Sequence, residues 1–189
     1  MMERAVRRGG AGKAVVGALV VGLLILLVVW GLLAPEPGLE PLDHAQLLIE
    51  INDTLDSFHQ SASRADGEAY FAHFAPEGVF LGTDATERWT VEQFHAYADP
   101  VFAQGRGWTY VPIAGQRHVD LIQGETIAVF DELLLNEKYG ECRGTGVLRN
   151  FGDEWLIVQY NLHFPVPNDL AETVTKLIQD ASTPPPSEP

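Results

Sequence analysis

The first hydrophobic pattern along the chain is continuous. Residues 14–33 read AVVGALVVGLLILLVVWGLL, and no charged side chain occurs between Lys13 and Glu36. As a helix this run rises about 30 Å, the thickness of the hydrocarbon core of a bilayer. Basic residues precede it and acidic residues follow it, a distribution that directs the N-terminus to the cytoplasm. We therefore predict a single-pass membrane protein with a basic cytoplasmic head at residues 1–13, a transmembrane signal anchor at 14–34, and a periplasmic or extracellular C-terminal domain.

A cleaved signal peptide is the alternative for the same segment. Its apolar region usually spans about 7–15 residues, which is shorter than the run seen here. The small-residue exit at Ala34 would also place Pro35 directly after the cut. We favour the retained anchor, with cleavage left open. Residues 35–42 are rich in Pro and predict a short linker, and residues 183–189 (TPPPSEP) predict a disordered tail.

Beyond the linker the apolar period becomes helical. One stripe at three- and four-residue spacing predicts an amphipathic helix capped by Asp43; it contains Leu48, Ile51, Leu55, Phe58 and Ala62. A second, short helix is expected from its cap Asp66 to a point before Pro76-Glu77-Gly78, which reads as a turn, and residues 79–81 then form a short strand.

A third helix is predicted by the pair Thr90 and Gln93, which fits a capping box. Its apolar residues, expected to be buried, are Phe94, Tyr97, Ala98 and Val101.

The second half of the domain has the character of β-structure. Four runs, at residues 108–119, 126–135, 142–148 and 155–164, are separated by short joints rich in turn-forming residues. Connections this short require antiparallel neighbours. A last helix is expected over residues 168–178, capped by Asn168. This order predicts an α+β fold, a curved antiparallel sheet packed on the N-terminal helices, with a pocket at the mouth of the resulting cone.

Charge and composition narrow the function classes. The 189 residues carry a formal charge of −14, and residues 14–189 alone carry eight basic and 25 acidic side chains, or −17. Such a domain repels phosphate backbones, which argues against nucleic-acid binding. A hydrophobic fraction of 46% argues against a disordered acidic chain. The single cysteine, Cys142, excludes an intrachain disulfide.

Several segments, in this order, resemble the SnoaL-like branch of the nuclear transport factor 2 (NTF2)-like superfamily. They are FLGTDATERW at 80–89, WTY at 108–110, FDEL at 130–133 with YGECRG at 139–144, the run at 155–161, and PVPN at 165–168. The resemblance covers about residues 44–178 and places a SnoaL-like domain at 43–182. It implies the cone-shaped α+β fold and a homodimer formed through the sheet. It does not choose a chemistry, because such folds host many functions.

The segment at residues 83–89 supplies the first candidate site residues. In a functional interpretation Asp84 is a pocket base or acceptor, Arg88 holds a carboxylate, and Trp89 forms an apolar wall. In a structural interpretation the Asp and Thr side chains cap the backbone of a loop, and Glu87 and Arg88 lie in solvent.

The later strands supply the other candidates. Asp131 and Glu132 are neighbours in a strand, so one should point inward and the other outward. We select Asp131, which could form a buried pair with Arg143 across the next turn, either as a structural ion pair or as a substrate clamp. Tyr160 on the last strand could donate a hydrogen bond to a developing oxyanion, although a packed aromatic is the plainer interpretation.

No motif indicates a metal or cofactor. The six histidines lack compact ligand spacing, and no phosphate-binding glycine loop or hydrolase elbow is present, so we expect neither metal nor cofactor. We favour a protein that binds a small apolar or amphipathic ligand, or a protein partner, through Asp84, Arg88, Trp89, Asp131, Arg143 and Tyr160. The alternative is an isomerase, dehydratase or cyclase that moves a proton on a carbonyl compound, with Asp84, Asp131 or Tyr160 as catalytic groups.

Overall fold

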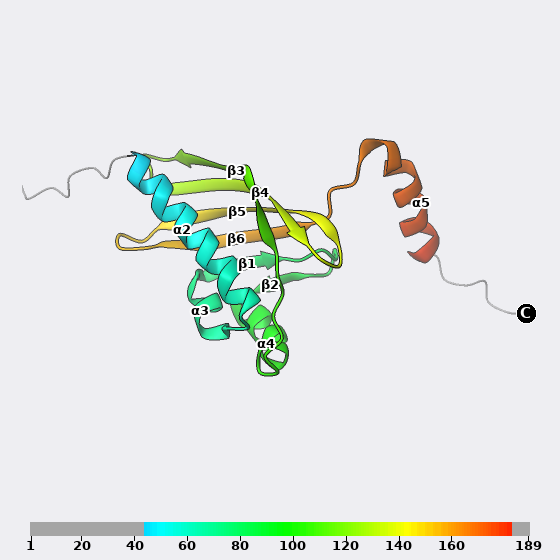
Figure 1. Ribbon diagram of the computed structural model, residues 1–189, viewed down its shortest axis with the longest axis horizontal. Helices are drawn as coiled ribbons and strands as arrows, with labels where there is room; N and C mark the ends of the chain where they lie inside the picture. The colour runs from blue at the N-terminus through cyan, green and yellow to red at the C-terminus, as the bar shows by residue number, and fades with distance from the viewer. Residues whose placement is uncertain (1–43, 183–189) are drawn as a thin grey trace, which may run out of the picture. The chain divides into compact units, whose positions relative to one another are not determined.

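A computed structural model describes residues 44–182 of the chain (Figure 1). The predicted anchor and its orientation, the linker, the Asp43 cap and the C-terminal tail lie outside the described residues. Within residues 44–182, none of the helices combines the length and the apolar character that crossing a membrane requires.

The described residues form one sheet, and helices precede its strands, connect two of them and follow the last one along the chain. The helices are α2 (His44–Ser63), α3 (Gly67–Ala72), α4 (Val91–Phe102), a 3-10 turn η1 (Asn168–Leu170) and α5 (Ala171–Ser182). The strands are β1 (Phe74–Leu81), β2 (Arg88–Thr90), β3 (Val111–Ile122), β4 (Ile127–Asn136), β5 (Gly140–Asn150) and β6 (Trp155–His163). The α+β class predicted from the sequence is confirmed.

The six strands form one sheet in the order β2-β1-β6-β5-β4-β3. The four C-terminal strands are antiparallel neighbours, as their short connections require. The expectation of a wholly antiparallel sheet is wrong, however, because β1 pairs with β6 in parallel. These two strands are joined through all the intervening elements, so short connections do not constrain their direction. Register shifts in β1, in β3 and between β5 and β6 mark bulges that bend the sheet.

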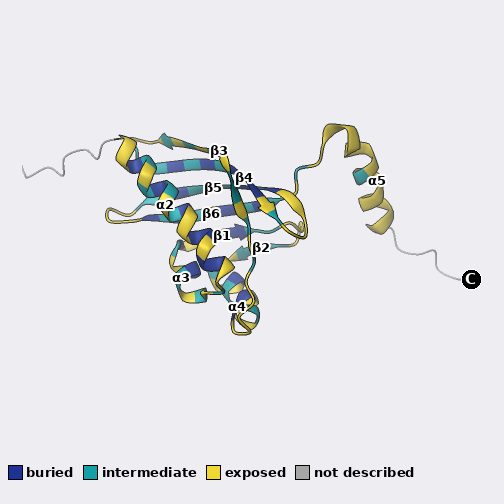
Figure 2. Cartoon of the chain, viewed as in Figure 1, coloured by how far each residue is buried: buried dark blue, intermediate teal, exposed yellow. Residues whose placement is uncertain are grey.

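Helix α2 lies across one face of the sheet and supplies much of the core (Figures 1 and 2). Its buried apolar stripe is Leu47, Ile51, Leu55, Phe58 and Ala62. The stripe follows the prediction except at its start, where Leu47 is buried and Leu48 is only half-buried. Phe58 stacks on Tyr70 of α3 with ring centroids 4.6 Å apart, so aromatic contacts join the first two helices.

The first strands differ most from the sequence prediction. Strand β1 begins at Phe74, and the segment Pro76-Glu77-Gly78 lies in a bulge within it instead of forming a turn. Strand β2, which was not predicted, pairs with the end of β1 and leads directly into α4. The capping box of α4 is confirmed. The backbone N–H of Gln93 donates to Thr90 Oγ1 at 3.2 Å, and the backbone N–H of Thr90 donates to the side-chain oxygen Oε1 of Gln93 at 3.0 Å.

The buried residues of α4 are Phe94, Ala98 and Phe102, whereas Tyr97 and Val101, expected in the core, are exposed and half-buried. The C-terminal helix also differs from the prediction. Asn168 makes no side-chain cap, and no residue of α5 is buried. Its apolar side chains, such as Leu177 and Ile178, are exposed, so this helix adds nothing to the core of the domain.

The pleat of β4 decides which side chains face α2. Ala128, Phe130, Glu132 and Leu134 are buried on the helix side, and the residues between them lie on the outer face. Arg117 of β3 lies directly opposite Glu132 in the register. In the bulge before it, Gly115 adopts a φ of +73°, a left-handed conformation that glycine accepts without strain.

Candidate functional site

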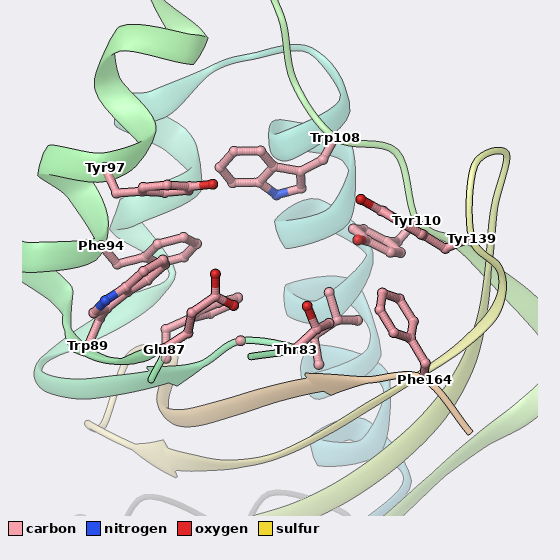
Figure 3. A pocket seen from close by; sticks show the side chains of 12 residues that line it. Thr83, Glu87, Trp89, Phe94, Tyr97, Trp108, Tyr110, Tyr139 and Phe164 are labelled. Carbon is pink, nitrogen blue, oxygen red and sulfur yellow. The ribbon is translucent and has the colours of Figure 1, made fainter. Parts of the chain in front are cut away.

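A cavity of about 310 Å³ opens between α4, the β1–β2 loop and the β4–β5 turn (Figure 3). Most of its wall consists of aromatic rings. The lining residues are Phe80, Gly82, Thr83, Glu87, Trp89, Phe94, Tyr97, Trp108, Tyr110, Tyr139, Leu162 and Phe164. We call this space the aromatic cavity.

Ring contacts fix the walls of the aromatic cavity. Trp89 packs on Tyr97 with centroids 4.7 Å apart, and Tyr139 packs on Phe164 at 4.9 Å. Trp108 packs on Phe102 of α4 at 4.6 Å. The predicted strand at residues 108–119 begins only at Val111, so Trp108 and Tyr110 belong to an irregular segment that turns both rings toward the cavity.

The β1–β2 loop contributes the one ionisable acid of the lining, Glu87. Its Oε2 accepts a hydrogen bond from the amide of Asp84 at 3.2 Å. The Asp84 carboxylate itself accepts from the amide and the hydroxyl of Thr86, at 2.8 and 2.6 Å, and these bonds lower the pKa of Asp84. Asp84 is exposed and organises the loop; Glu87 faces the cavity (Figure 3).

A second, smaller cavity of about 20 Å³ continues inward and shares four lining residues with the aromatic cavity: Phe80, Trp108, Tyr110 and Leu162. His59 of α2 and Tyr160 of β6 line this inner end. The volume is enough for about one water molecule. The aromatic cavity therefore leads toward two polar side chains that lie in the core.

Behind the inner end lies a buried polar network centred on Glu132, which is 0% exposed. Its Oε1 lies 2.6 Å from His59 Nε2 and accepts from the Tyr160 hydroxyl at 3.4 Å. Its Oε2 accepts from Arg117 Nε at 2.8 Å, and Arg117 Nη2 also lies 2.8 Å away. Arg117 continues to α2, where Nη1 lies 2.8 Å from Asp56 Oδ1 and donates to Asn52 Oδ1 at 3.1 Å.

The network fixes the charge of Glu132. Burial opposes ionisation, but the hydrogen bonds and charges of His59 and Arg117 outweigh it and lower the pKa of the Glu132 carboxyl. An ionised Glu132 can only accept, so His59 donates from Nε2 and keeps Nδ1 as its free acceptor when the ring is neutral. Burial and the charge of Glu132 raise the pKa of Tyr160 well above its usual value, which keeps its phenol protonated.

Of the site residues predicted from the sequence, some line the cavity and others lie away from it. Trp89 lines the aromatic cavity and Tyr160 lines its inner end. Arg88 is exposed and does not line either space. Asp131 and Arg143 lie on the outer face of the sheet, where they form an ion pair of 3.6 Å with side chains 41% and 42% exposed. The expected pairing is present, but the expectation that it is buried is wrong, because the pair lies on the outer face and away from the cavity.

Sequence reasoning did not single out His59 or Arg117, and it selected Asp131 in preference to Glu132. Its structural interpretation placed Glu87 in solvent, whereas Glu87 lines the cavity. The alternation of β4 required one of Asp131 and Glu132 to face inward, and the structure places Glu132 there. His59 follows Phe58 directly and extends the buried stripe of α2 by one position. Within residues 44–182, no group of three His, Cys, Asp or Glu side chains is arranged to hold a metal ion.

The family model of the SnoaL-like domain matches residues 51–167, more than half of the chain. No curated protein matches this chain. Among solved structures, an NTF2-like protein of unknown function from Pseudomonas putida KT2440 shares 16% identity at a TM-score of 0.52, covering 64% of this chain and 88% of its own. A proposed dehydratase of the NTF2-like family from Streptomyces avermitilis shares 12% identity at a TM-score of 0.53, covering 66% of this chain and 100% of its own. At such identities the likeness is one of fold.

Proposed function

Because the chain belongs to the SnoaL-like domain family, within the NTF2-like fold, we propose that it binds a small amphipathic molecule in the aromatic cavity. Members of this fold either bind ligands or catalyse reactions on them, so the family leaves the choice to the site. The observation that carries the proposal is the cavity itself, about 310 Å³ walled by aromatic rings with a few polar groups. Specific small-molecule sites have this size and composition.

A thermal-shift screen of the full-length chain against lipids, polyketides, steroids and small aromatic amphiphiles tests the proposal. A ligand present at 100 times its dissociation constant stabilises the folded state by about 2.7 kcal/mol, which raises the melting temperature by several degrees. Thr83→Trp places an indole at the mouth of the aromatic cavity from an exposed loop, and Ala85→Trp adds the same ring to a neighbouring residue that does not line it. A bound ligand should lose its effect in the first variant and keep it in the second. Equal effects in both variants would contradict binding in this cavity.

A second candidate function is proton transfer at the inner end of the cavity. The observation that favours it is the contact of 2.6 Å between His59 and the buried carboxylate of Glu132, beside the Tyr160 hydroxyl. The inner end has room for about one water molecule, so only the carbonyl group of a ligand seated in the aromatic cavity would enter it. There Glu132 would orient the imidazole, His59 Nδ1 would take a proton next to that carbonyl, and Tyr160 would donate to the resulting enolate oxygen. In this arrangement His59 takes the role of base that the sequence suggested for Asp84 or Asp131.

Deuterium incorporation next to the carbonyl of a bound ketone, followed by NMR, tests this second function. His59→Gln should abolish the exchange that the wild-type chain catalyses, whereas Asp131→Asn, on the outer face, should leave it unchanged. Exchange that survives in His59→Gln would exclude His59 as the base.

The location and assembly of the domain are further proposals. We propose from the sequence that residues 14–34 anchor it to a membrane with the cavity on the periplasmic or extracellular side, and that it forms a homodimer through its sheet. A reporter that is active only outside the cytoplasm, fused after residue 36, should give activity; an inactive fusion would contradict the orientation. Light scattering of the full-length chain should give the mass of a dimer, and a monomer mass would contradict the assembly.

A further inference from the structure

The aromatic cavity has a negatively charged side chain in its lining and no positively charged one. Among its twelve lining residues Glu87 is the one acid, and none is basic. Within residues 44–182 no Lys, Arg or His side chain forms an ion pair with Glu87. A ligand with a carboxylate or phosphate would meet a negative charge here with no compensating cation among the lining residues.

The backbone of the β1–β2 loop makes room for the Glu87 side chain. A Cβ on Gly82 would lie 2.0 Å from Glu87 Oε2 and 2.9 Å from Glu87 Cβ, a contact that no other residue could make without displacing the acid. The Gly82 amide N–H also donates to the Glu87 carbonyl at 2.8 Å, which closes the loop. The glycine therefore makes room for the carboxylate, which Figure 3 shows pointing into the cavity that Trp89 and Phe94 also line.

The rings around this carboxylate are the kinds that attract cations. Trp89, Trp108, Tyr97 and Tyr110 line one space, and a cation within about 6 Å of the face of such a ring is attracted by the ring quadrupole. Burial raises the pKa of Tyr110 to about 12, and acidic neighbours including Glu87 add to the shift, so this phenol stays neutral. At the rim, the chain's own Lys138 ammonium lies 4.6 Å from the centroid of Tyr139 without lining the cavity.

We propose that the ligand of the aromatic cavity carries an organic ammonium group, tertiary or quaternary, that the Trp and Tyr rings enclose and the Glu87 carboxylate neutralises. This inference rests on the proposed function, since it names the chemical class of the ligand that the cavity binds. Alkyl groups on the nitrogen suit the rings, and the charge suits the carboxylate. The formal charge of −14 on the chain favours the approach of a cation in the same direction.

Two probes of the same shape test the charge alone: 4-hydroxyphenyltrimethylammonium and its neutral carbon isostere, 4-tert-butylphenol. Their dissociation constants for the full-length chain are measured by isothermal titration calorimetry near pH 7. We expect the ammonium probe to bind at least tenfold more tightly than its isostere. Glu87→Gln should remove most of this preference, and Glu92→Gln, which makes the same charge change at an exposed residue of α4, should keep it.

Gly82→Ala provides an independent variant, because it leaves the carboxylate in the chain but displaces it from the cavity. It should weaken the ammonium probe severalfold and the neutral isostere to a smaller extent, because the added methyl group itself lies in the lining. Circular dichroism establishes that each variant is folded before titration.

The outcomes separate the two proposals. If both probes bind equally well and Glu87→Gln leaves both constants unchanged, the ammonium inference is overturned and the aromatic cavity remains a binding site for neutral amphiphiles. If neither these probes nor any compound of the thermal-shift screen binds, the proposed function fails and the inference fails with it.

Discussion

Replacing Glu132 by Gln tests whether the buried network joins α2 to the sheet. The carboxylate contacts His59 from α2, Arg117 from β3 and Tyr160 from β6, so three elements depend on one side chain. Gln keeps the volume and some hydrogen bonds but removes the charge that compensates Arg117.

The size of the effect follows from burial. Breaking a buried ion pair by removing one partner costs about 3–5 kcal/mol. Glu132 is 0% exposed, which argues for a large loss, but the Arg117 side chain is 11% exposed and keeps its contacts with Asp56 and Asn52. We therefore expect Glu132→Gln to lower the free energy of unfolding by about 3 kcal/mol, the low end of this range.

Equilibrium urea unfolding followed by circular dichroism measures this loss. At a slope of about 2 kcal/mol per molar urea, the midpoint should fall by about 1.5 M with the slope unchanged. Asp131→Asn, the adjacent residue on the same strand, breaks a half-exposed pair and should cost at most about 1 kcal/mol. If Glu132→Gln costs no more than Asp131→Asn, the network does not stabilise the fold as described.

Three further predictions concern pH, packing and capping. The pKa of the Glu132 carboxyl is about 4.3 in the unfolded chain and lower in the folded chain. Its stabilisation is therefore complete above the unfolded pKa and is lost as the pH falls through the folded pKa. Urea midpoints measured from pH 7 to 3 should fall more steeply in wild type than in Glu132→Gln, and parallel curves would contradict this. Gly144→Ala would place a Cβ 2.4 Å from the Tyr160 hydroxyl, so it should cost about 1–3 kcal/mol in thermal unfolding, and an unchanged melting temperature would refute this close approach. Thr90→Ala removes the hydroxyl of the capping box and should cost about 1 kcal/mol, which Thr90→Ser should restore if the capping bond is responsible.

The parts of the fold governed by local pattern could be predicted from the sequence. The helical stripe of α2, the capping box at Thr90 and the four antiparallel strands each depend on residues close together in the chain. The parallel pairing of β1 with β6 could not be predicted this way, because it joins residues about 80 positions apart. The bulge at residues 76–78 has the composition of a turn, and only the pairing partner reveals that the strand continues through it.

Only part of the candidate site could be predicted from the sequence. Trp89, before α4, was expected to form an apolar pocket wall, and it lines the cavity. The choice between Asp131 and Glu132 required the inward face of β4 to be known, and a one-residue error moves the acid to the opposite side of the sheet. The contact of His59 with Glu132 joins residues 73 positions apart, so no local pattern predicts it.

The claim that the aromatic cavity binds a ligand is tested most directly by the indole N–H signals of the tryptophans in a 15N NMR titration. Trp89 and Trp108 line the cavity, whereas Trp155 is buried elsewhere in the core and does not line it. A compound that stabilises the chain should shift the Trp89 and Trp108 signals in a saturable manner and leave Trp155 unchanged. A stabilising compound that leaves Trp89 and Trp108 unchanged would contradict the account.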